Sequence, residues 1–247
     1  MTKKQRYQIV LDYFEKAIAN PETELLYVSP YQLLVAVILS AQCTDVRVNL
    51  TTPAIFAKYP TPVELSKASF EEVFPLIRSI SYPNNKTKHL IGMAIMLLDK
   101  FNGEVPMTVD ELVQLPGVGR KTANVVTSVV DAQPNMAVDT HVFRVSARLG
   151  LTTKARTPLA AEKQLIKYIP TVLVHKAHHW LILHGRYTCV ARSPKCIKCG
   201  LTDICPYYKK LQKQLGVTFQ MYCIIDLFLA IVVLRLTPPN NYCRAHL

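Results

Sequence analysis

The chain has 247 residues, and because 50% of them are apolar and 19% are charged, the composition excludes an intrinsically disordered or a collagen-like protein. Lysine and arginine total 29 against 17 aspartates and glutamates, so the net charge is +12. A folded protein of such positive charge is expected to bind a polyanion, either a nucleic acid or an anionic membrane surface.

Helix start signals recur along the chain. A hydroxyl residue precedes a proline, as at the N-cap and first position of a helix, at Ser29-Pro30, Thr61-Pro62 and Thr157-Pro158. A glutamate follows a hydroxyl residue at capping-box spacing in the pairs Thr61/Glu64, Ser69/Glu72 and Thr108/Glu111. Two apolar runs have helical period, Leu33, Leu34, Val37, Ile38 and Ala41, and then Leu90, Ile91, Ala94, Ile95 and Leu98, the second ending near Asn102-Gly103. These patterns predict about ten helices and no strand, hence an all-α fold.

A glycine-containing turn separates two predicted helices, Thr108–Leu115 and Arg120–Val130. Gly117 and Gly119 let the chain turn sharply, so that backbone N–H groups at the start of the second helix form an anion site. The arrangement indicates a helix-hairpin-helix that grips a DNA phosphate without contacting the bases. The alternative is an ordinary corner between two helices, in which the glycines serve packing alone.

Two charged residues after this turn form a candidate catalytic pair. Lys121 opens the second helix, where the macrodipole disfavours a cation, and together with partial burial this favours the uncharged, nucleophilic amine. The alternative role of Lys121 is a simple phosphate contact. Asp139 lies at an N-cap position, and its carboxylate could also face Lys121 and a positive charge developing on a sugar.

Four of the seven cysteines are concentrated in one short segment, with the spacing C-x6-C-x2-C-x5-C. They are Cys189, Cys196, Cys199 and Cys205. Four thiolates suit either zinc or an iron–sulfur cluster, and the alternative is a disulfide pair or unrelated thiols. Basic residues near them are expected to contact a DNA backbone, namely Arg186, Arg192, Lys195 and Lys198. The histidine-rich run at 175–184 is interpreted as a packed helix rather than a metal site.

The C-terminal segment differs from the rest in composition. Residues 213–247 contain an apolar run, Val217–Leu234, that reaches the length of a membrane span, but Asp226 lies at its middle, where a charge is costly. We therefore expect an extension that the functional fold does not need, with a membrane tether as the alternative. The first residues show no secretory signal, because charged residues interrupt any apolar run, so an intracellular protein is expected.

Several of these motifs together resemble the endonuclease III family, which comprises bacterial DNA glycosylases of the helix-hairpin-helix superfamily. The resemblance is carried by LSAQCTD (39–45), LPGVGRKTA (115–123), VDTHVFRV (138–145) and HHWLILHGRYTC (178–189), together with the four-cysteine spacing. It extends over residues 1–212 and leaves out the tail from about Val217.

The resemblance implies a two-lobed helix-hairpin-helix DNA glycosylase fold. Residues 22–132 would form a six-helix lobe with the hairpin at 108–130, and residues 1–21 with 133–212 would form a lobe that carries a 4Fe-4S cluster on the four cysteines. It implies a monomer that binds double-stranded DNA in the bacterial cytoplasm, at the nucleoid, and does not bind a membrane.

The resemblance also implies a reaction. Lys121 would attack C1′ of a damaged nucleotide, expel an oxidised pyrimidine and form a Schiff base, after which β-elimination would cut the strand. Asp139 would activate this nucleophile and stabilise charge on the sugar. Gln42 matches the residue that fills the gap left by the extruded base, since chemistry on a base requires taking it out of the stack.

One loop departs from the family pattern. Where the family usually has a glycine and then a leucine wedge, this chain has Ser81 and Tyr82, followed by Pro83. Tyr82 is expected to serve as the wedge that enters the base stack, while Ser81 and Pro83 change the geometry of the loop.

Two other functions fit part of these motifs. A monofunctional glycosylase of the same superfamily typically lacks a lysine at the position of Lys121 and has a further C-terminal domain. A non-catalytic iron–sulfur DNA-binding module would share the hairpin and the cysteines but would not need Lys121 paired with Asp139. The motifs therefore favour a bifunctional DNA glycosylase and lyase of base excision repair.

Overall fold

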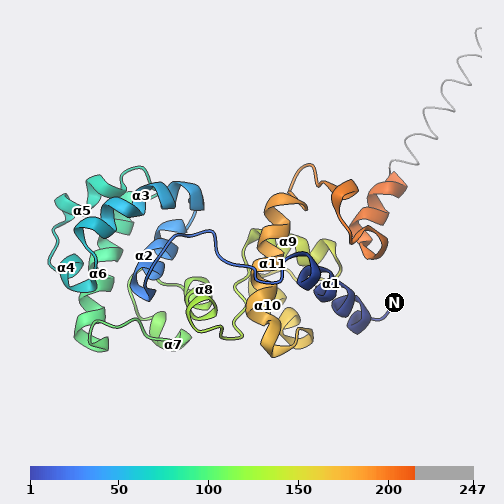
Figure 1. The fold of residues 1–247 in the computed structure, drawn as a ribbon, viewed down its shortest axis with the longest axis horizontal. Coiled ribbons are helices and arrows are strands. Elements are labelled where there is room, and N and C mark those ends of the chain that lie inside the picture. The colour runs from blue at the N-terminus through green and yellow to red at the C-terminus, as the bar shows by residue number, and fades with distance from the viewer. Residues whose placement is uncertain (215–247) are drawn as a thin grey trace, which may run out of the picture.

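The fold is all-α in the residues that the computed structural model describes, 1–214, as the sequence predicted (Figure 1). Eleven α-helices have both ends within this range, three short 3-10 helices accompany them, and residues 206–214 are helical as well. The predictions for the apolar run Val217–Leu234 lie outside the described residues. Between residues 1 and 214, no helix is both long and apolar enough to cross a bilayer.

The predicted hydroxyl caps form at the starts of the helices. The side chains of Ser29, Thr61 and Thr157 each accept a hydrogen bond from a backbone N–H in the first turn of the helix that follows. Complete capping boxes form at Thr61 and at Ser69. At Thr108 the hydroxyl caps the helix, but the glutamate bonds to that hydroxyl at 2.6 Å rather than to the backbone N–H. Each cap satisfies an otherwise unpaired N–H, which is why these helix starts could be located from sequence.

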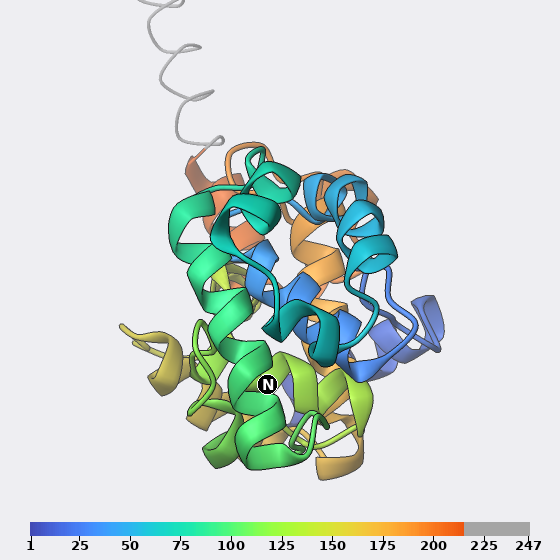
Figure 2. The ribbon, with the colours of Figure 1, turned by 90° about the vertical axis from the view of Figure 1, so that its left-hand side faces the viewer.

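A first hydrophobic core is centred on α2 (Pro30–Ser40). The other helices of this core are α3 (Asp45–Lys58), α4 (Pro62–Ser66), α5 (Phe70–Ile77), α6 (Pro83–Phe101), α7 (Val109–Leu112) and α8 (Arg120–Val130). In Figure 2 they face the viewer, with the second group of helices behind them. α2 packs against α3, α6 and α8 and is buried at Tyr31 and from Leu33 to Leu39.

Two predicted helix faces differ from the observed ones. α2 is buried on all sides rather than along one stripe, and Ala41 lies beyond its end and is exposed. In α6, Ile95 was expected in the core but is 43% exposed, while Met93 and Leu97 are fully buried. The periodicity located both helices, but the side that each buries depends on which helices pack against it.

A second hydrophobic core combines the two ends of the described chain. Its helices are α1 (Lys3–Ala17), α9 (Thr140–Arg148), α10 (Pro158–Tyr168) and α11 (Val174–Tyr187). The 3-10 helices lie at Thr171–Leu173, Cys196–Lys198 and Thr202–Ile204. Trp180 of α11 is fully buried in this core, and its indole N–H donates to the carbonyl of Ile18 at 2.7 Å, just after α1.

The chain passes between the two cores twice. Residues 18–29 lead from α1 to α2, and residues 131–139 lead back from α8 to α9. Figure 1 shows the two groups of helices side by side, with α1 lying among α9, α10 and α11. Because both crossings are short and lie between the cores, they bring residues from both halves of the chain to one boundary.

Candidate active site and cysteine cluster

A cavity of about 400 Å³ opens at the boundary between the two cores. It is lined by residues 22–25 of the first crossing, by the end of α2, by the first turn of α8, by the start of α9 and by α11. Three predicted site residues, Lys121, Asp139 and Gln42, line this one cavity. Tyr82, Gly117, Gly119 and the four cysteines do not line it.

Lys121 and Asp139 each stand at the beginning of a helix. Lys121 is the second residue of α8 and is exposed, so the partial burial predicted for it is not found. Asp139 is the N-cap of α9, and its Oδ1 accepts the backbone N–H of Val142 at 2.7 Å. The predicted capping role of Asp139 is therefore confirmed, and the same carboxylate also reaches the cavity wall.

Gln42 and Tyr82 occupy two turns at the edge of the first core. Gln42 follows the end of α2, and Tyr82 is the N-cap of α6. Both have left-handed backbone conformations, with φ of 55° and 58°, which are uncommon for residues with a side chain. The turns touch, because the Ser81 hydroxyl donates to the Gln42 carbonyl at 2.8 Å. Tyr82 lies at the surface and is 63% exposed.

The two glycines of the turn before α8 differ in the space that is available for a Cβ atom. Gly117 has φ of 81°, and a Cβ added to it would lie 2.8 Å from Cβ of His89, so no larger residue fits there. A Cβ added to Gly119 would meet no atom within 4 Å. Gly119 is also the N-cap of α8 and has no side chain, so no N-cap side chain bonds to the N–H groups of the first turn.

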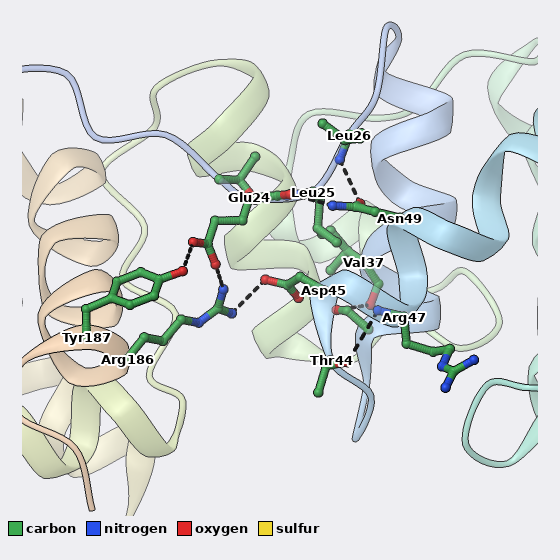
Figure 3. Close-up of polar contacts among 12 residues, drawn as sticks. Glu24, Leu25, Leu26, Val37, Thr44, Asp45, Arg47, Asn49, Arg186 and Tyr187 are labelled. Atoms are coloured by element: carbon green, nitrogen blue, oxygen red, sulfur yellow. Dashed lines mark hydrogen bonds and ion pairs between the residues drawn. The ribbon is translucent and has the colours of Figure 1, made fainter.

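A network of charged and polar side chains spans the cavity between the cores (Figure 3). The guanidinium of Arg186, near the end of α11, forms ion pairs with Glu24 of the first crossing and with Asp45 at the start of α3, the latter at 2.6 Å. The hydroxyl of Tyr187 donates to the other oxygen of Glu24. The network thus ties the two cores and the first crossing together at the cavity.

This network was not predicted from the sequence, and Arg186 was expected elsewhere. Arg186 was grouped with the basic residues near the cysteines, because it lies three positions before Cys189. In the structure its guanidinium points toward Glu24 and Asp45 instead, as Figure 3 shows, and Arg186 lines the cavity. Glu24 lies in a crossing segment with no helix or motif, so no sequence signal identified it.

Two buried histidines of α11 also line the cavity, His178 and His179. Burial lowers the pKa of His178 to about 3 and that of His179 to about 4. Both imidazoles are therefore uncharged near neutral pH. Within residues 1–214, no group of three or more His, Cys, Asp or Glu side chains is arranged to hold a metal ion. The histidine-rich run forms the packed helix α11, as predicted, and His178, His179 and His184 are buried in it.

The four predicted cysteines gather at the far end of the second core. Cys189, Cys196, Cys199 and Cys205 all line one small cavity of about 20 Å³, and none of them is in a disulfide among the described residues. Burial, and then the neighbouring thiols of Cys189 and Cys205, raise the pKa of Cys196, as expected for sulfurs close together.

Two arginines of α9 hold the segment that carries these cysteines. The Arg148 guanidinium donates to the carbonyls of Val190 and Ala191, each at 2.7 Å, and lies 3.4 Å from the Cys189 sulfur. The Arg144 guanidinium donates to the Cys189 carbonyl at 3.1 Å. The helix that begins at Asp139 therefore contacts the cavity at one end and the cysteine segment at the other.

Comparisons with known proteins agree with this geometry. A model of the HhH-GPD superfamily of base excision DNA repair proteins matches residues 35–171. Endonuclease III of Rickettsia conorii is 47% identical over 203 residues, which are 82% of this chain and 96% of the relative. Endonuclease III of Escherichia coli is 43% identical over 211 residues, which are 85% of this chain and 99% of the relative.

Solved structures show the same similarity in three dimensions. A trapped endonuclease III–DNA covalent intermediate with an estranged adenine matches with a TM-score of 0.81 at 46% identity, over 86% of this chain and 100% of that chain. A thermostable thymine-DNA glycosylase matches with a TM-score of 0.74 at 23% identity, over 84% and 97% of the two chains, which shows a shared fold.

Proposed function

Because the chain belongs to the HhH-GPD superfamily of base excision DNA repair proteins, and within it to the endonuclease III family, we propose which of its residues carry out the family's reaction. The protein is a bifunctional DNA glycosylase and lyase of base excision repair, and its partner is DNA. The assignment of residues is supported by one observation above all, that Lys121, Asp139 and Gln42 line a single cavity.

Lys121 is the nucleophile in this proposal. The lone pair of its amine forms a bond to C1′ of the damaged nucleotide while the glycosidic bond breaks, and the oxidised pyrimidine leaves with that electron pair and takes up a proton. Loss of a proton from the nitrogen and opening of the sugar ring give a Schiff base. Removal of a proton from C2′ then breaks the C3′–O bond and cuts the strand on the 3′ side.

The surroundings of Lys121 favour this role. The amine attacks through its lone pair, and Lys121 stands in the first turn of α8, on the wall of the cavity. His178 and His179 are buried and uncharged, and they line the same cavity. The attack therefore takes place beside neutral imidazoles, while exposure leaves the amine open to an incoming sugar.

Asp139 stabilises the positive charge that develops on the sugar. Its Oδ1 is held at 2.7 Å by the Val142 N–H, which fixes the carboxylate at the cavity wall and leaves Oδ2 to face the substrate. A carboxylate with a fixed orientation needs no reorganisation when the charge appears, and this is the general basis of electrostatic catalysis.

The DNA-binding residues are Gln42, Tyr82, Gly117 and Gly119. Gln42 lies in an exposed turn at the rim of the cavity and would fill the gap in the duplex, while the exposed ring of Tyr82 would enter the stack as a wedge. The open space around Gly119 and the uncapped N–H groups of α8 would accept a backbone phosphate.

Four cysteines would hold the cofactor, a 4Fe-4S cluster. They fit such a group because all four sulfurs line one cavity and none is used in a disulfide among the described residues. When bound, the group would supply a crosslink between the four cysteine positions of the segment rather than redox chemistry. Arg144 and Arg148 hold this segment in place, and Lys195 and Lys198 extend from it toward a DNA backbone.

The organisation of the whole protein follows from the same proposal. We take the two hydrophobic cores as the two lobes predicted from sequence, residues 22–132 and residues 1–21 with 133–212, with DNA bound across the cavity between them. We also propose that the protein acts as a monomer in the bacterial cytoplasm, at the nucleoid.

Borohydride trapping on duplex DNA with an abasic site tests the reaction, because borohydride reduces a Schiff base to a stable amine. Wild-type protein should form a covalent complex, and Lys121→Ala should form none. Asp139→Asn should lower the rate by about a hundredfold or more, while it binds DNA as tightly as wild type.

The control for this experiment is Lys163→Ala, which removes an exposed lysine of α10 that does not line the cavity. If Lys121→Ala still traps, another amine is the nucleophile. If the protein binds DNA but never traps, the lyase assignment is wrong, and a measurement of base release then separates a monofunctional glycosylase from a non-catalytic DNA-binding module.

Metal analysis of purified protein tests the cofactor. We expect about four irons per chain and loss of all of them in a variant with serine at Cys196 and Cys199. Stoichiometric zinc without iron would contradict the proposed cluster.

A further inference from the structure

The turn after α2 is held by side chains from the start of α6. The Ser81 hydroxyl donates to the Gln42 carbonyl at 2.8 Å. The Lys86 ammonium donates to the carbonyls of Leu39 at 2.8 Å and Ala41 at 2.6 Å. The last carbonyls of a helix have no partner within the helix, so these bonds complete the end of α2 from outside.

A single residue, Lys86, bonds both to this turn and to the turn of Tyr82, one through its ammonium and the other through its backbone N–H. Its backbone N–H donates to the Tyr82 carbonyl at 3.1 Å, while its ammonium reaches α2. The side chain is buried, with 5% of the residue exposed. Carbonyls at the C-terminal end of a helix favour a cation, which explains how a lysine can be buried here.

Both turns have a backbone that needs support. Gln42 and Tyr82 are in the left-handed region at φ of 55° and 58°. Such conformations persist where the surrounding structure determines them. Ser81 and Lys86 bond to the carbonyls of these two residues and to that of the neighbouring Ala41.

We propose that Ser81 and Lys86 are positioning residues that hold the Gln42 turn and the Tyr82 turn as one rigid unit. The two exposed side chains then meet the duplex at a fixed separation when a nucleotide leaves the stack. Because the unit is already ordered, less entropy is lost when it enters the DNA. This inference rests on the proposed DNA-binding roles of Gln42 and Tyr82.

The test compares two substrates that differ in whether a base pair must be opened. One is a duplex with thymine glycol paired with adenine, and the other carries thymine glycol in a single-nucleotide bulge. The readout is the ratio of kcat/KM on the paired duplex to kcat/KM on the bulge. A residue that acts on base-pair opening changes this ratio, whereas a residue needed only for folding or chemistry lowers both values equally.

Lys86→Met should lower this ratio by about tenfold, because it removes two hydrogen bonds from a charged donor. Ser81→Ala should lower it by about threefold, since one neutral and more exposed bond is lost. In both variants KM on the paired duplex should rise while kcat on the bulge is kept. Lys88→Met is the matched control, because Lys88 is exposed on the same helix and is not one of the residues whose side chains bond to the turns, and the ratio should not change.

A double-mutant cycle decides whether Lys86 acts through Gln42. Gln42→Ala should lower the ratio at least as much as Lys86→Met, and adding Lys86→Met to Gln42→Ala should lower it little further. An equal loss on both duplexes, or a full second loss in the Gln42→Ala background, would overturn the proposal. Ser81→Ala keeps the test decisive if Lys86→Met does not fold. If wild-type protein traps no abasic DNA, the proposed function fails instead of this inference.

Discussion

At the scale of single residues, Asp139 has the helix-capping role that its sequence context predicts. It also lies in the wall of the cavity, which the sequence could not establish. It is the N-cap of α9, and it also lines the cavity with Lys121. The two are compatible because a carboxylate has two oxygens and the helix cap uses one of them. The local pattern predicted the cap, but the approach of α8 and α9 depends on the packing of two cores.

For Lys121 and Arg186, the neighbouring residues in the sequence did not reveal the exposure or the direction of the side chain. Lys121 was expected to be partly buried, but the first turn of α8 opens onto the cavity and leaves it exposed. Arg186 was expected beside the cysteines, but its side chain reaches Glu24 and Asp45. Proximity in the sequence brings two backbone positions close together, but the direction of a long charged side chain depends on where its charge partners lie.

The buried histidines of α11 predict a loss of stability in mild acid. The pKa of His178 is about 3 and that of His179 about 4, both below the usual 6.5 because of burial. Below pH 6.5 the unfolded chain therefore binds protons that the folded protein does not, so the free energy of unfolding decreases as the pH falls from 6.5 toward 4. Between neutral pH and about pH 5 we expect a loss of about 2 kcal/mol for each histidine, measured by urea denaturation.

The variants His178→Gln and His179→Gln should each reduce this dependence on pH. His89→Gln is the control, because it makes the same substitution at an exposed histidine outside α11 and should leave this dependence unchanged. Equal stability at the two pH values in the wild type would show that burial does not keep these imidazoles neutral.

At the scale of elements, the sequence located the glycine turn before α8. It did not reveal that the two glycines differ in backbone conformation and in the space around them. Both glycines were expected to serve the sharp turn. In the structure Gly117 has the positive φ and the close contact with His89, whereas Gly119 has an ordinary extended backbone and open space around it. The close contact at Gly117 depends on the packing of α6, which provides His89, against the turn.

Substitution of these glycines should therefore have opposite effects. Gly117→Ala should destabilise the protein by ~1–3 kcal/mol, because a left-handed backbone and a 2.8 Å contact both oppose a Cβ. Gly119→Ala should keep the wild-type Tm but weaken binding of abasic duplex DNA by about tenfold, since its methyl group would stand where a phosphate approaches α8.

Thermal unfolding and the Kd for abasic duplex DNA, measured on both variants, separate these effects. An unchanged Kd for Gly119→Ala would show that DNA does not approach the chain closely at this position. An unchanged Tm for Gly117→Ala would show that α6 moves to accept the methyl group at little cost.

At the scale of the whole molecule, the two hydrophobic cores and the cavity between them arise from the path of the chain. α1 packs with α9, α10 and α11 rather than with α2, so residues 18–29 must cross the boundary. This crossing brings Glu24 to Arg186 and completes one wall of the cavity (Figure 3). The cavity thus exists because both ends of the described chain share one core.

A chain that ends at Gln214 should keep the wild-type Tm and the wild-type rate of borohydride trapping. Both cores and every candidate site residue lie within residues 1–214. The related Rickettsia and Escherichia proteins are matched over 96% and 99% of their own lengths by 203 and 211 residues of this chain. Circular dichroism and trapping on abasic DNA measure the two properties.

A chain that ends at Gly200 is the contrasting control. It lacks Leu201 and Cys205, which are buried in the second core, and should not fold stably. Loss of trapping in the chain that ends at Gln214 would show that the removed residues take part in the activity.

The sequence by itself determined the helices, the starts set by Ser29, Thr61 and Thr157, the glycine turn and the grouping of four cysteines within one segment. These features depend on interactions between residues a few positions apart, which a single chain displays directly. The tertiary structure alone decided that Lys121 and Asp139 share a cavity, that Arg186 spans it, and that Lys86 joins the turns of Gln42 and Tyr82. These contacts join residues far apart in the chain, and their geometry follows from how whole helices pack, which no local pattern encodes.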